Sequence, residues 1–294
     1  MVGKNLVELL EKNGMSVDCP GRGELDLLEK KHVDDYLKRK SPEVVVHCAG
    51  LVGGIQANIA RPYDFASKNY LMGFNLIDGC LKNNVAKVIN LGSSCMYPKE
   101  AMNPLIEESI LTGTLEPTNE GYAIAKIAIS RLCAYANMQF GTKYKTLIPC
   151  NIYGKFDDFS LETSHLIPGV MHRIHATKHS GKGVMTVWGD GEARREFMYA
   201  SDLAEFICFS IEKYDKIPEL MNVGMGFDFS IREYYDMISE IVGFKGSFDF
   251  DLSKPVGMKK KLVDTSMQKR LGWAPPTEMM DGLRKTYSYF LEQY

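Results

Sequence analysis

The sequence lacks the features that mark membrane proteins and secreted proteins. No apolar run among its 294 residues approaches the roughly 20 residues that a membrane helix needs. The amino terminus also lacks the basic, then apolar, then small-residue order of a signal peptide. An excess of charge is missing too, since 35 Lys and Arg against 37 Asp and Glu leave a formal net charge of −2. We therefore expect neither a nucleic-acid partner nor a membrane partner, while one basic pocket for a small anion remains compatible with this balance.

Paired cysteines are missing as well. The seven cysteines are scattered along the chain, with no C-x-x-C pair and no Cys/His cluster at zinc spacing. This usage predicts no metal site and favours a reducing, cytoplasmic location.

Strand and helix patterns alternate through the first half of the chain. Short, β-branched and largely uncharged runs are typical of strands buried on both faces of a parallel sheet. These runs are residues 43–50, 87–92 and 145–150. Between them lie helical patterns at about 66–84 and 120–140, while the chain opens in a helix that is followed by a strand candidate at 15–19. The alternation predicts an α/β fold with a Rossmann-type, doubly wound parallel sheet.

The second half of the chain has a different character. A stretch rich in Gly, His and Lys at 172–194 precedes helical patterns near 231–242 and 278–293. We expect residues 1–155 to form the Rossmann-like domain and residues 156–294 to form mainly a smaller substrate-binding lobe, with segments that cross back to the first domain.

One pair of residues carries a chemical signal. Tyr122 and Lys126 stand four residues apart in a predicted helix, which places a phenol and an ammonium on one face. Ser93 follows the predicted strand 87–92, and ligands of open parallel sheets bind beyond the carboxyl ends of the strands. A hydroxyl, a phenol and an ammonium can therefore converge on one carbonyl group, where we expect the cation to lower the pKa of the phenol.

These residues resemble the Ser-Tyr-Lys set of the extended short-chain dehydrogenase/reductases, and further strings resemble the GDP-L-fucose synthase family within it. The strings occur in the family's order over nearly the whole chain. They are VGGI at 52–55, GSSCMYP at 92–98, LEPTNEGYAIAK at 115–126, NIYG at 151–154, SHLIP at 164–168, and WGDG at 188–191 followed by REF at 195–197.

The resemblance implies an NADPH-dependent enzyme that epimerises a GDP-4-keto-6-deoxy-hexose at C3 and C5 and then reduces C4 to give GDP-L-fucose. For the reduction it implies that Tyr122 protonates the alkoxide, Ser93 hydrogen-bonds the same oxygen, and Lys126 holds the nicotinamide ribose. For the epimerisations it implies Cys95 and His165 as the base and the acid. A thiol and an imidazole have ordinary pKa values on either side of neutral, which suits both tasks.

The resemblance also implies a set of substrate contacts. Arg173 and Arg195 match positions that bind the GDP phosphates, and planar guanidinium groups suit phosphate oxygens. Trp188 is expected to pack on the guanosine side, Lys261 to add charge near the pyrophosphate, and Asn151 to steady the loop that carries the sugar. A homodimer formed through the helices 66–84 and 120–140 is the expected assembly.

The start of the sequence departs from the family pattern. A G-x-x-G-x-x-G turn after a first strand normally receives the cofactor's pyrophosphate, and here only Gly3 matches it, as the last glycine. We expect a sheet without its first strand to be unstable as written, because that strand lies between two neighbours. Arg22 falls where the family places a base for the 2′-phosphate, which favours NADPH over NADH.

Three other functions remain open at this point. A C4 reductase without epimerase activity, acting on a GDP-heptose or GDP-deoxysugar, would have the same build. A non-catalytic or inactive nucleotide-binding relative would explain the incomplete turn. A 4,6-dehydratase is disfavoured, because Ser94 and Cys95 stand where such enzymes carry an Asp-Glu pair. Solvent deuterium incorporation separates the first of these from an epimerase, and an NADPH titration tests the second.

Overall fold

A computed structural model describes residues 1–253 and 258–294. Its centre is a parallel sheet in the order β1-β2-β3-β8. The strands are β1 (Val44–His47), β2 (Lys87–Leu91), β3 (Lys145–Pro149) and β8 (Leu220–Val223). The first three fall inside the runs 43–50, 87–92 and 145–150, which confirms the predicted parallel α/β sheet.

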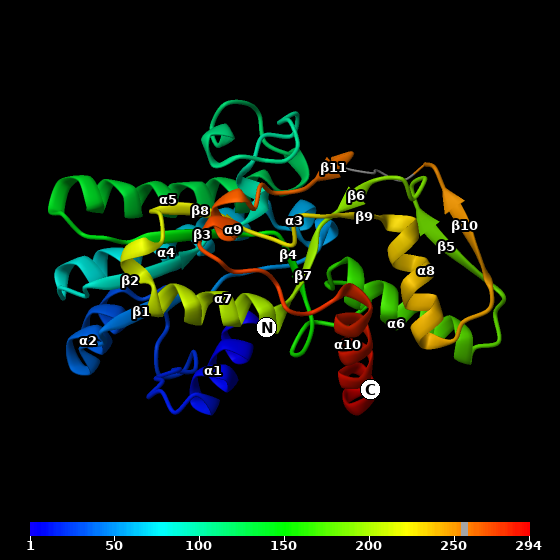
Figure 1. Cartoon of the computed structure of the whole chain (residues 1–294), viewed down its shortest axis with the longest axis horizontal. Coiled ribbons are helices and arrows are strands. Elements are labelled where there is room, and N and C mark those ends of the chain that lie inside the picture. The colour runs from blue at the N-terminus through cyan, green and yellow to red at the C-terminus, as the bar shows by residue number, and fades with distance from the viewer. Residues whose placement is uncertain (254–257) are drawn as a thin grey trace.

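Helices cover both faces of this sheet, as the doubly wound prediction requires (Figure 1). One face carries α2 (Lys30–Lys40), α4 (Pro62–Lys82) and α5 (Glu120–Phe140), and the other carries α1 (Val2–Lys12) and α7 (Ala200–Glu212). Adjacent residues of β2 point to opposite faces of the sheet. Val88 packs on the side of α2, α4 and α5, and Ile89 packs on the side of α1 and α7. The sheet is therefore buried on both faces.

Two long helices pack against each other closely enough to require a glycine. A Cβ atom added at Gly73 of α4 would lie 2.5 Å from the Cγ1 of Ile129 in α5. A second close approach brings the starts of the two helices together, because a Cβ at Gly121 would lie 2.8 Å from the carbonyl oxygen of Pro62. Tyr122, the next residue, is thereby held at the start of α5.

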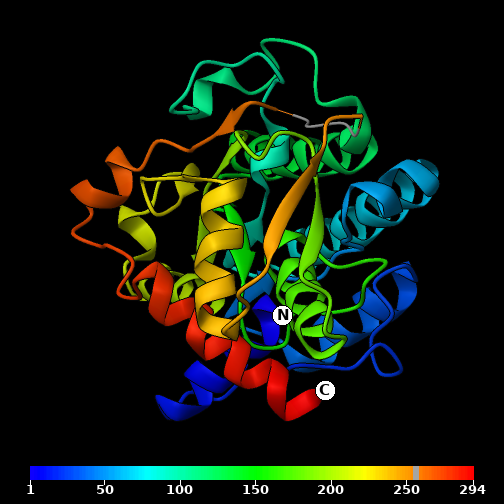
Figure 2. The ribbon, with the colours of Figure 1, turned by 90° about the vertical axis from the view of Figure 1, so that its right-hand side faces the viewer.

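A second body with its own core lies at the other end of the molecule (Figure 1) and faces the viewer in Figure 2. Its helices are α6 (Leu166–His179), α8 (Ile231–Val242) and α10 (Met279–Gln293), and its parallel strands are β5 (Val184–Trp188) and β10 (Ser247–Asp251). The expected helices 231–242 and 278–293 correspond to α8 and α10. The chain crosses back to the first body through α7 and β8, which lie beyond residue 156. A domain boundary between residues 155 and 156 therefore remains a proposal.

Short elements join the two bodies. Two small sheets pair β4 (Asn151–Tyr153) with β7 (Phe197–Tyr199), and β6 (Arg194–Arg195) with both β9 (Phe229–Ser230) and β11 (Lys260–Lys261). The remaining helices are α3 (Ile55–Ala60), α9 (Ser266–Arg270) and the 3-10 turns η1 (Ser94–Met96), η2 (Glu107–Ser109), η3 (Pro117–Asn119) and η4 (Tyr214–Lys216). In the described ranges, no helix has the length and apolar content needed to cross a membrane.

The strand predicted at residues 15–19 is wrong. These residues lie between α1 and α2 without regular structure, although Val17 packs against the core cluster. Within the described residues β1 is hydrogen-bonded to β2 alone and forms an edge of the sheet. A strand is stable only when its backbone groups have a pairing partner. An apolar pattern alone was therefore insufficient to make segment 15–19 a strand.

Candidate active site

The turn after β2 presents Ser93 and Cys95 together. A Cβ added at Gly92 would lie 2.9 Å from the Sδ of Met96, so the glycine permits the tight turn. The Oγ of Ser93 accepts a hydrogen bond of 3.2 Å from the backbone N–H of Cys95 and caps η1. The hydroxyl and the thiol therefore lie just beyond the carboxyl end of one buried strand, where the sequence predicts that a ligand binds.

Tyr122 and Lys126 meet this turn from the first turns of α5. Lys126 is only 8% exposed, and its Nζ donates a hydrogen bond of 2.8 Å to the carbonyl oxygen of Leu91, the last residue of β2. The same Nζ lies 5.8 Å from the centroid of the Tyr122 ring. The side chain of Ser93 is within hydrogen-bonding reach of the phenol. Hydroxyl, phenol and ammonium thus gather at one place.

The electrostatics of the phenol differ from the expectation. Burial raises the pKa of Tyr122 above its ordinary value, the nearby Cys95 raises it further, and the Ser93 side chain lowers it in part. Burial also lowers the pKa of Lys126 to about 8, with Cys48 opposing that shift. The predicted lowering of the phenol's pKa by Lys126 was wrong, because burial dominates and the ammonium is bound to the Leu91 carbonyl. A raised pKa keeps the phenol protonated at neutral pH, as a proton donor requires.

The thiol of Cys95 is surrounded by donors from distant segments. The Nδ2 of Asn119, in η3, lies 3.2 Å from its Sγ, and the Nζ of Lys261 lies 3.4 Å from the same atom. The family resemblance places Lys261 near the pyrophosphate and implies no role for Asn119. Asn119 stands three residues before Tyr122, inside the string 115–126 that resembles the family. The string therefore marks Asn119 as a candidate site residue, but it does not indicate that Asn119 contacts Cys95.

His165 belongs to the second body, where it is the residue that precedes α6. Loss of solvent lowers the pKa of the half-buried imidazole, and the charge of Asp158 opposes this shift. The backbone N–H of Gly54 donates a hydrogen bond of 3.1 Å to the carbonyl oxygen of Thr163, and a Cβ at Gly54 would lie 2.9 Å from the carbonyl oxygen of Ser164. The glycines of the string 52–55 thus let the loop after β1 contact the loop that carries His165. Within the described residues, no hydrogen bond links His165 to Cys95.

Two predicted phosphate ligands are neighbours on paired strands. Arg195 of β6 and Lys261 of β11 are directly opposite each other in a parallel pairing. Burial lowers the pKa of Arg195, while the charges of Cys95 and Glu116 raise it, so the guanidinium also lies near the thiol. The site therefore contains two cations beside Cys95.

The other predicted substrate contacts lie further out. Arg173 of α6 donates a hydrogen bond of 2.7 Å to the phenol oxygen of Tyr235, and Trp188 at the end of β5 is 47% exposed. Asn151 donates a hydrogen bond of 2.8 Å to the carbonyl oxygen of Glu196, which ties β4 to the segment after Arg195. The structure thus groups Arg195 and Lys261 with Cys95 and places Arg173 and Trp188 in the second body.

The predicted cofactor residues lie beside β1. A Cβ at Gly3, in α1, would lie 3.5 Å from the Cβ of Cys48, which directly follows β1. Lys126 is close enough to Cys48 to affect its pKa, which burial raises to about 12. The start of α1 and the catalytic lysine therefore approach the same end of β1. Arg22 lies in an exposed loop with its side chain 78% accessible, 3.8 Å from the carboxylate of Asp26.

A cavity opens beside the catalytic phenol. Its volume is about 180 Å³, and it is lined by α3, by η3 and by the starts of α4 and α5, including Asn119 and Tyr122. Among the described residues, no group of three or more His, Cys, Asp or Glu side chains is arranged to hold a metal ion.

Comparison with known proteins extends this picture. The family described as the NAD dependent epimerase/dehydratase family matches residues 1–224. A GDP-L-colitose synthase of Yersinia pseudotuberculosis is 49% identical over 294 residues, covering 100% of this chain and 96% of the relative. A GDP-L-fucose synthase of Azorhizobium caulinodans is 43% identical over 291 residues, covering 99% and 93%.

A solved structure shows the same architecture. A GDP-mannoheptose C4 reductase from Campylobacter jejuni with NADP bound has a TM-score of 0.88 and 31% identity, covering 99% of this chain and 95% of that one. Because the family match spans more than half of the chain and the relatives align along nearly all of it, the protein belongs to the NAD dependent epimerase/dehydratase family of enzymes.

Proposed function

We propose that the protein epimerises a GDP-4-keto-6-deoxy-hexose at C3 and C5 and reduces it at C4 with NADPH, giving GDP-L-fucose. The observation that carries this proposal is that two sets of proton-transfer groups share one site. Tyr122 and Ser93 suit reduction of a ketone, and Cys95 lies close enough to raise the pKa of that same phenol. A substrate bound once can therefore meet both sets.

In the reduction, NADPH supplies the hydride that reaches C4. Tyr122 gives its proton to the oxygen that becomes the alcohol, and Ser93 hydrogen-bonds that oxygen. Lys126 would hold the nicotinamide ribose, and its position beside both the phenol and the end of β1 supports this role. The start of α1 near Gly3 suits the cofactor's pyrophosphate, because helix N-termini favour anions. Arg22 then faces the 2′-phosphate.

In the epimerisations, the C4 ketone acidifies the protons on C3 and C5. Cys95 and His165 exchange these protons on opposite faces of the ring, while Tyr122 and Ser93 hydrogen-bond the enolate oxygen. The lowered pKa of His165 keeps the imidazole largely neutral at neutral pH. Because its pKa is lowered, the protonated form of His165 is a stronger acid than an ordinary imidazolium and donates its proton readily.

We propose that cationic side chains and one indole bind the substrate's GDP group. Arg195 and Arg173 would bind phosphate oxygens, Trp188 would pack on the guanosine, and Lys261 would add charge near the pyrophosphate. Asn151 would steady the sugar loop through its bond to Glu196. The names of the two curated relatives, GDP-L-colitose synthase and GDP-L-fucose synthase, support a GDP-linked L-sugar as the product.

One assay in D₂O tests the proposal. The full chain is incubated with GDP-4-keto-6-deoxy-mannose and NADPH, with a matched sample that lacks enzyme. We expect NADPH oxidation, GDP-L-fucose as the product, and deuterium at C3 and C5 above the sample without enzyme. If neither NADPH oxidation nor deuterium uptake exceeds that sample, the proposed function is wrong.

A second candidate is a C4 reductase without epimerase activity, acting on a GDP-heptose or a GDP-deoxysugar. The structural likeness to a GDP-mannoheptose C4 reductase favours it. Oxidation of NADPH without deuterium at C3 or C5 would identify it in the same assay. A GDP-4-ketoheptose tested beside the 6-deoxyhexose compares kcat/KM for the two sugar classes. A non-catalytic relative would show neither turnover nor NADPH binding in a titration.

We also propose a homodimer formed through α4 and α5, which lie side by side (Figure 1). Both helices expose large apolar side chains to solvent, and monomeric proteins seldom expose many together. These side chains are Tyr63, Tyr70, Leu71, Ile124, Tyr135, Met138 and Phe140. The seven cysteines are all free thiols, which supports our proposal of a cytoplasmic location.

A further inference from the structure

In the described part of the chain, nitrogen donors from two segments that are far apart in the sequence contact the thiol of Cys95. Asn119 Nδ2 lies 3.2 Å from the Sγ, and Lys261 Nζ lies 3.4 Å from it. A thiol accepts hydrogen bonds weakly, whereas a thiolate accepts them strongly and is stabilised by an adjacent ammonium. An ammonium and an amide N–H donor therefore both lie within hydrogen-bonding distance of this sulfur atom.

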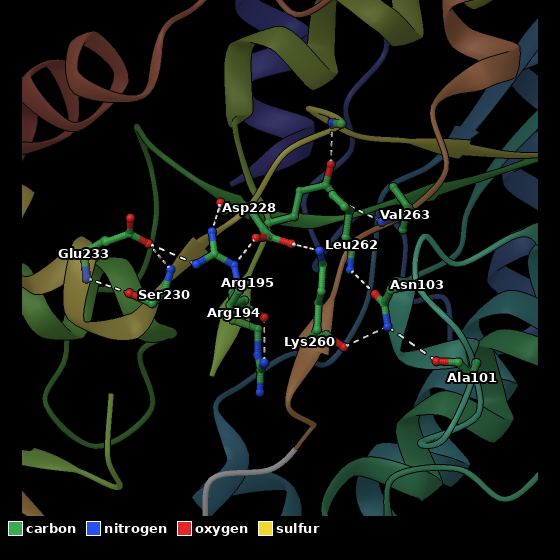
Figure 3. Close-up of polar contacts among 12 residues, drawn as sticks. Ala101, Asn103, Arg194, Arg195, Asp228, Ser230, Glu233, Lys260, Leu262 and Val263 are labelled. Carbon is green, nitrogen blue, oxygen red and sulfur yellow. Dashed lines mark hydrogen bonds and ion pairs between the residues drawn. The ribbon is translucent and has the colours of Figure 1, made fainter. Parts of the chain in front are cut away.

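The backbone on either side of Lys261 is fixed by one asparagine. The Oδ1 of Asn103 accepts a hydrogen bond of 2.8 Å from the N–H of Leu262, and its Nδ2 donates one of 3.3 Å to the carbonyl oxygen of Lys260 (Figure 3). Parallel pairing with Arg195 fixes the residue from the other side. Lys261 is 9% exposed, so little of the residue is in contact with water.

Glu196 fixes the next part of the same segment. It is 0% exposed, and its Oε2 accepts a hydrogen bond of 2.9 Å from the N–H of Val263. Its Oε1 accepts from the N–H groups of Met225 and Gly226, at 2.6 and 2.8 Å. Burial raises the pKa of Glu196 to about 7, with these backbone N–H groups opposing the shift. The segment that carries Lys261 is therefore anchored to the loop after β8 as well.

We propose that Lys261, with Asn119, holds Cys95 as a thiolate and thereby makes Cys95 the base that removes the proton beside the C4 ketone. This inference rests on the proposed epimerase function and changes the role of Lys261 from a pyrophosphate contact to a positioning residue for the thiolate. In the step, the C–H bond breaks and the proton forms an S–H bond. The electron pair moves into the enolate, whose oxygen Tyr122 and Ser93 hydrogen-bond. His165 in its imidazolium form then protonates the carbon from the other face, after which the thiol returns its proton to solvent and the imidazole takes one up from solvent.

Other charged and titratable groups also face the thiol. Arg195 is a second cation near Cys95, but Glu116 lies beside it and offsets part of its charge. Tyr122 is neutral at neutral pH, because its pKa is raised. The Nζ of Lys261 lies within hydrogen-bonding distance of the Sγ, so the removal of this ammonium should act directly on the thiol.

The test measures how the alkylation rate of Cys95 depends on pH, in full-length protein without substrate. Lys261→Met is compared with Lys260→Met, because Lys260 is the adjacent lysine and instead pairs with Asp228 at 3.2 Å. Iodoacetamide reacts with the thiolate and carries no charge. Trypsin releases residues 88–99, which contain Cys95 as their single cysteine, and residues 13–22, in which the exposed Cys19 serves as an internal reference.

We expect the midpoint of the Cys95 profile to rise by about one pH unit in Lys261→Met, as loss of an adjacent opposite charge would cause. The alkylation rate of Cys95 at the alkaline plateau should stay the same. A change in the accessibility of the thiol would instead alter the rate at that plateau. Lys261→Arg should restore the wild-type midpoint, and Lys260→Met should keep it. Equal midpoints in Lys261→Met, Lys260→Met and wild-type protein would overturn the proposal. Loss of the alkaline plateau in both Lys261→Met and Lys261→Arg would overturn it as well.

Deuterium exchange separates this inference from the function on which it rests. If the midpoint moves but the wild-type enzyme puts no deuterium into C3 or C5, the thiolate contact stands while its use in epimerisation is overturned. If wild-type protein exchanges deuterium and Lys261→Met exchanges it equally fast at pH 7, Lys261 has no part in the step. We expect exchange in Lys261→Met to fall about tenfold, in line with one pH unit.

Discussion

The Nζ of Lys126 donates a 2.8 Å hydrogen bond to the carbonyl oxygen of Leu91, which anchors the catalytic ammonium to the end of β2. Ser93 and Cys95 follow that same strand end within four residues of Leu91. One backbone carbonyl therefore connects the helix that carries Tyr122 with the turn that carries the hydroxyl and the thiol. The groups that we propose for reduction and for epimerisation share this support, and single substitutions should separate the two proposed activities.

Tyr122→Phe should abolish reduction and leave epimerisation largely intact. Removing the phenol takes away the proton that the new alkoxide needs, and loss of a general acid costs about 10²- to 10⁴-fold in rate. NADPH oxidation and deuterium uptake at C3 and C5, measured on the same sample, check this. Ser93 still hydrogen-bonds the enolate oxygen in this variant, so loss of both activities together would mean that the epimerisations also depend on the hydrogen bond or the proton of the phenol.

Cys95→Ser should show the opposite pattern. A serine hydroxyl is a far weaker base than a thiolate, so deuterium uptake should fall by at least about a hundredfold. The reductase groups Ser93 and Tyr122 remain, and reduction of a substrate that is already epimerised should continue. Unchanged deuterium uptake would contradict the assignment of Cys95 and favour the simple C4 reductase.

Reduction should weaken on the alkaline side of neutral pH. Burial lowers the pKa of Lys126 to about 8, so this side chain is charged below that pH and becomes neutral above it. An ordinary lysine would keep its charge to about pH 10. We expect the single-turnover reduction rate, or the affinity for NADPH, to fall with a midpoint near the pKa of Lys126. A flat profile up to pH 9.5 would show that the charge of Lys126 is not needed.

Arg22→Ala should reduce the preference for NADPH over NADH. The exposed guanidinium is assigned to the 2′-phosphate, which NADH lacks. Affinity for NADPH should fall by about tenfold, in keeping with the loss of a charge-assisted hydrogen bond, while affinity for NADH should stay the same. Fluorescence titration with both nucleotides measures the ratio. An equal loss for both would place Arg22 outside the 2′-phosphate site.

Tyr135→Glu should weaken the proposed dimer. Tyr135 is 53% exposed on α5 and borders a small groove between α4 and α5. An unpaired carboxylate buried in a subunit interface would raise the dissociation constant by at least about tenfold. Light scattering across a dilution series measures this. Met102→Glu, at a position 87% exposed outside these helices, is the matched control and should leave the assembly unchanged.

The sequence by itself determined the elements whose residues satisfy a local pattern. The strands β1, β2 and β3 and the helix α5 lie within or at the predicted ranges, because buried strands and amphipathic helices leave a periodic signature. Ser93, Tyr122 and Lys126 could be grouped in advance for the same reason. Each lies at a defined point of such an element, and the geometry of a parallel sheet brings those points together.

Tertiary structure alone decided the relationships that no local pattern encodes. Residues 15–19 have the composition of a strand, but pairing with another strand decides whether they form one. The contact between Lys261 and Cys95 joins positions 166 residues apart and depends on Asn103 to fix the lysine's backbone. Burial, which also depends on distant segments, turned the expected lowering of the phenol's pKa into a rise. Long-range packing therefore sets the charge states of the site, while the sequence pattern sets which residues take part in it.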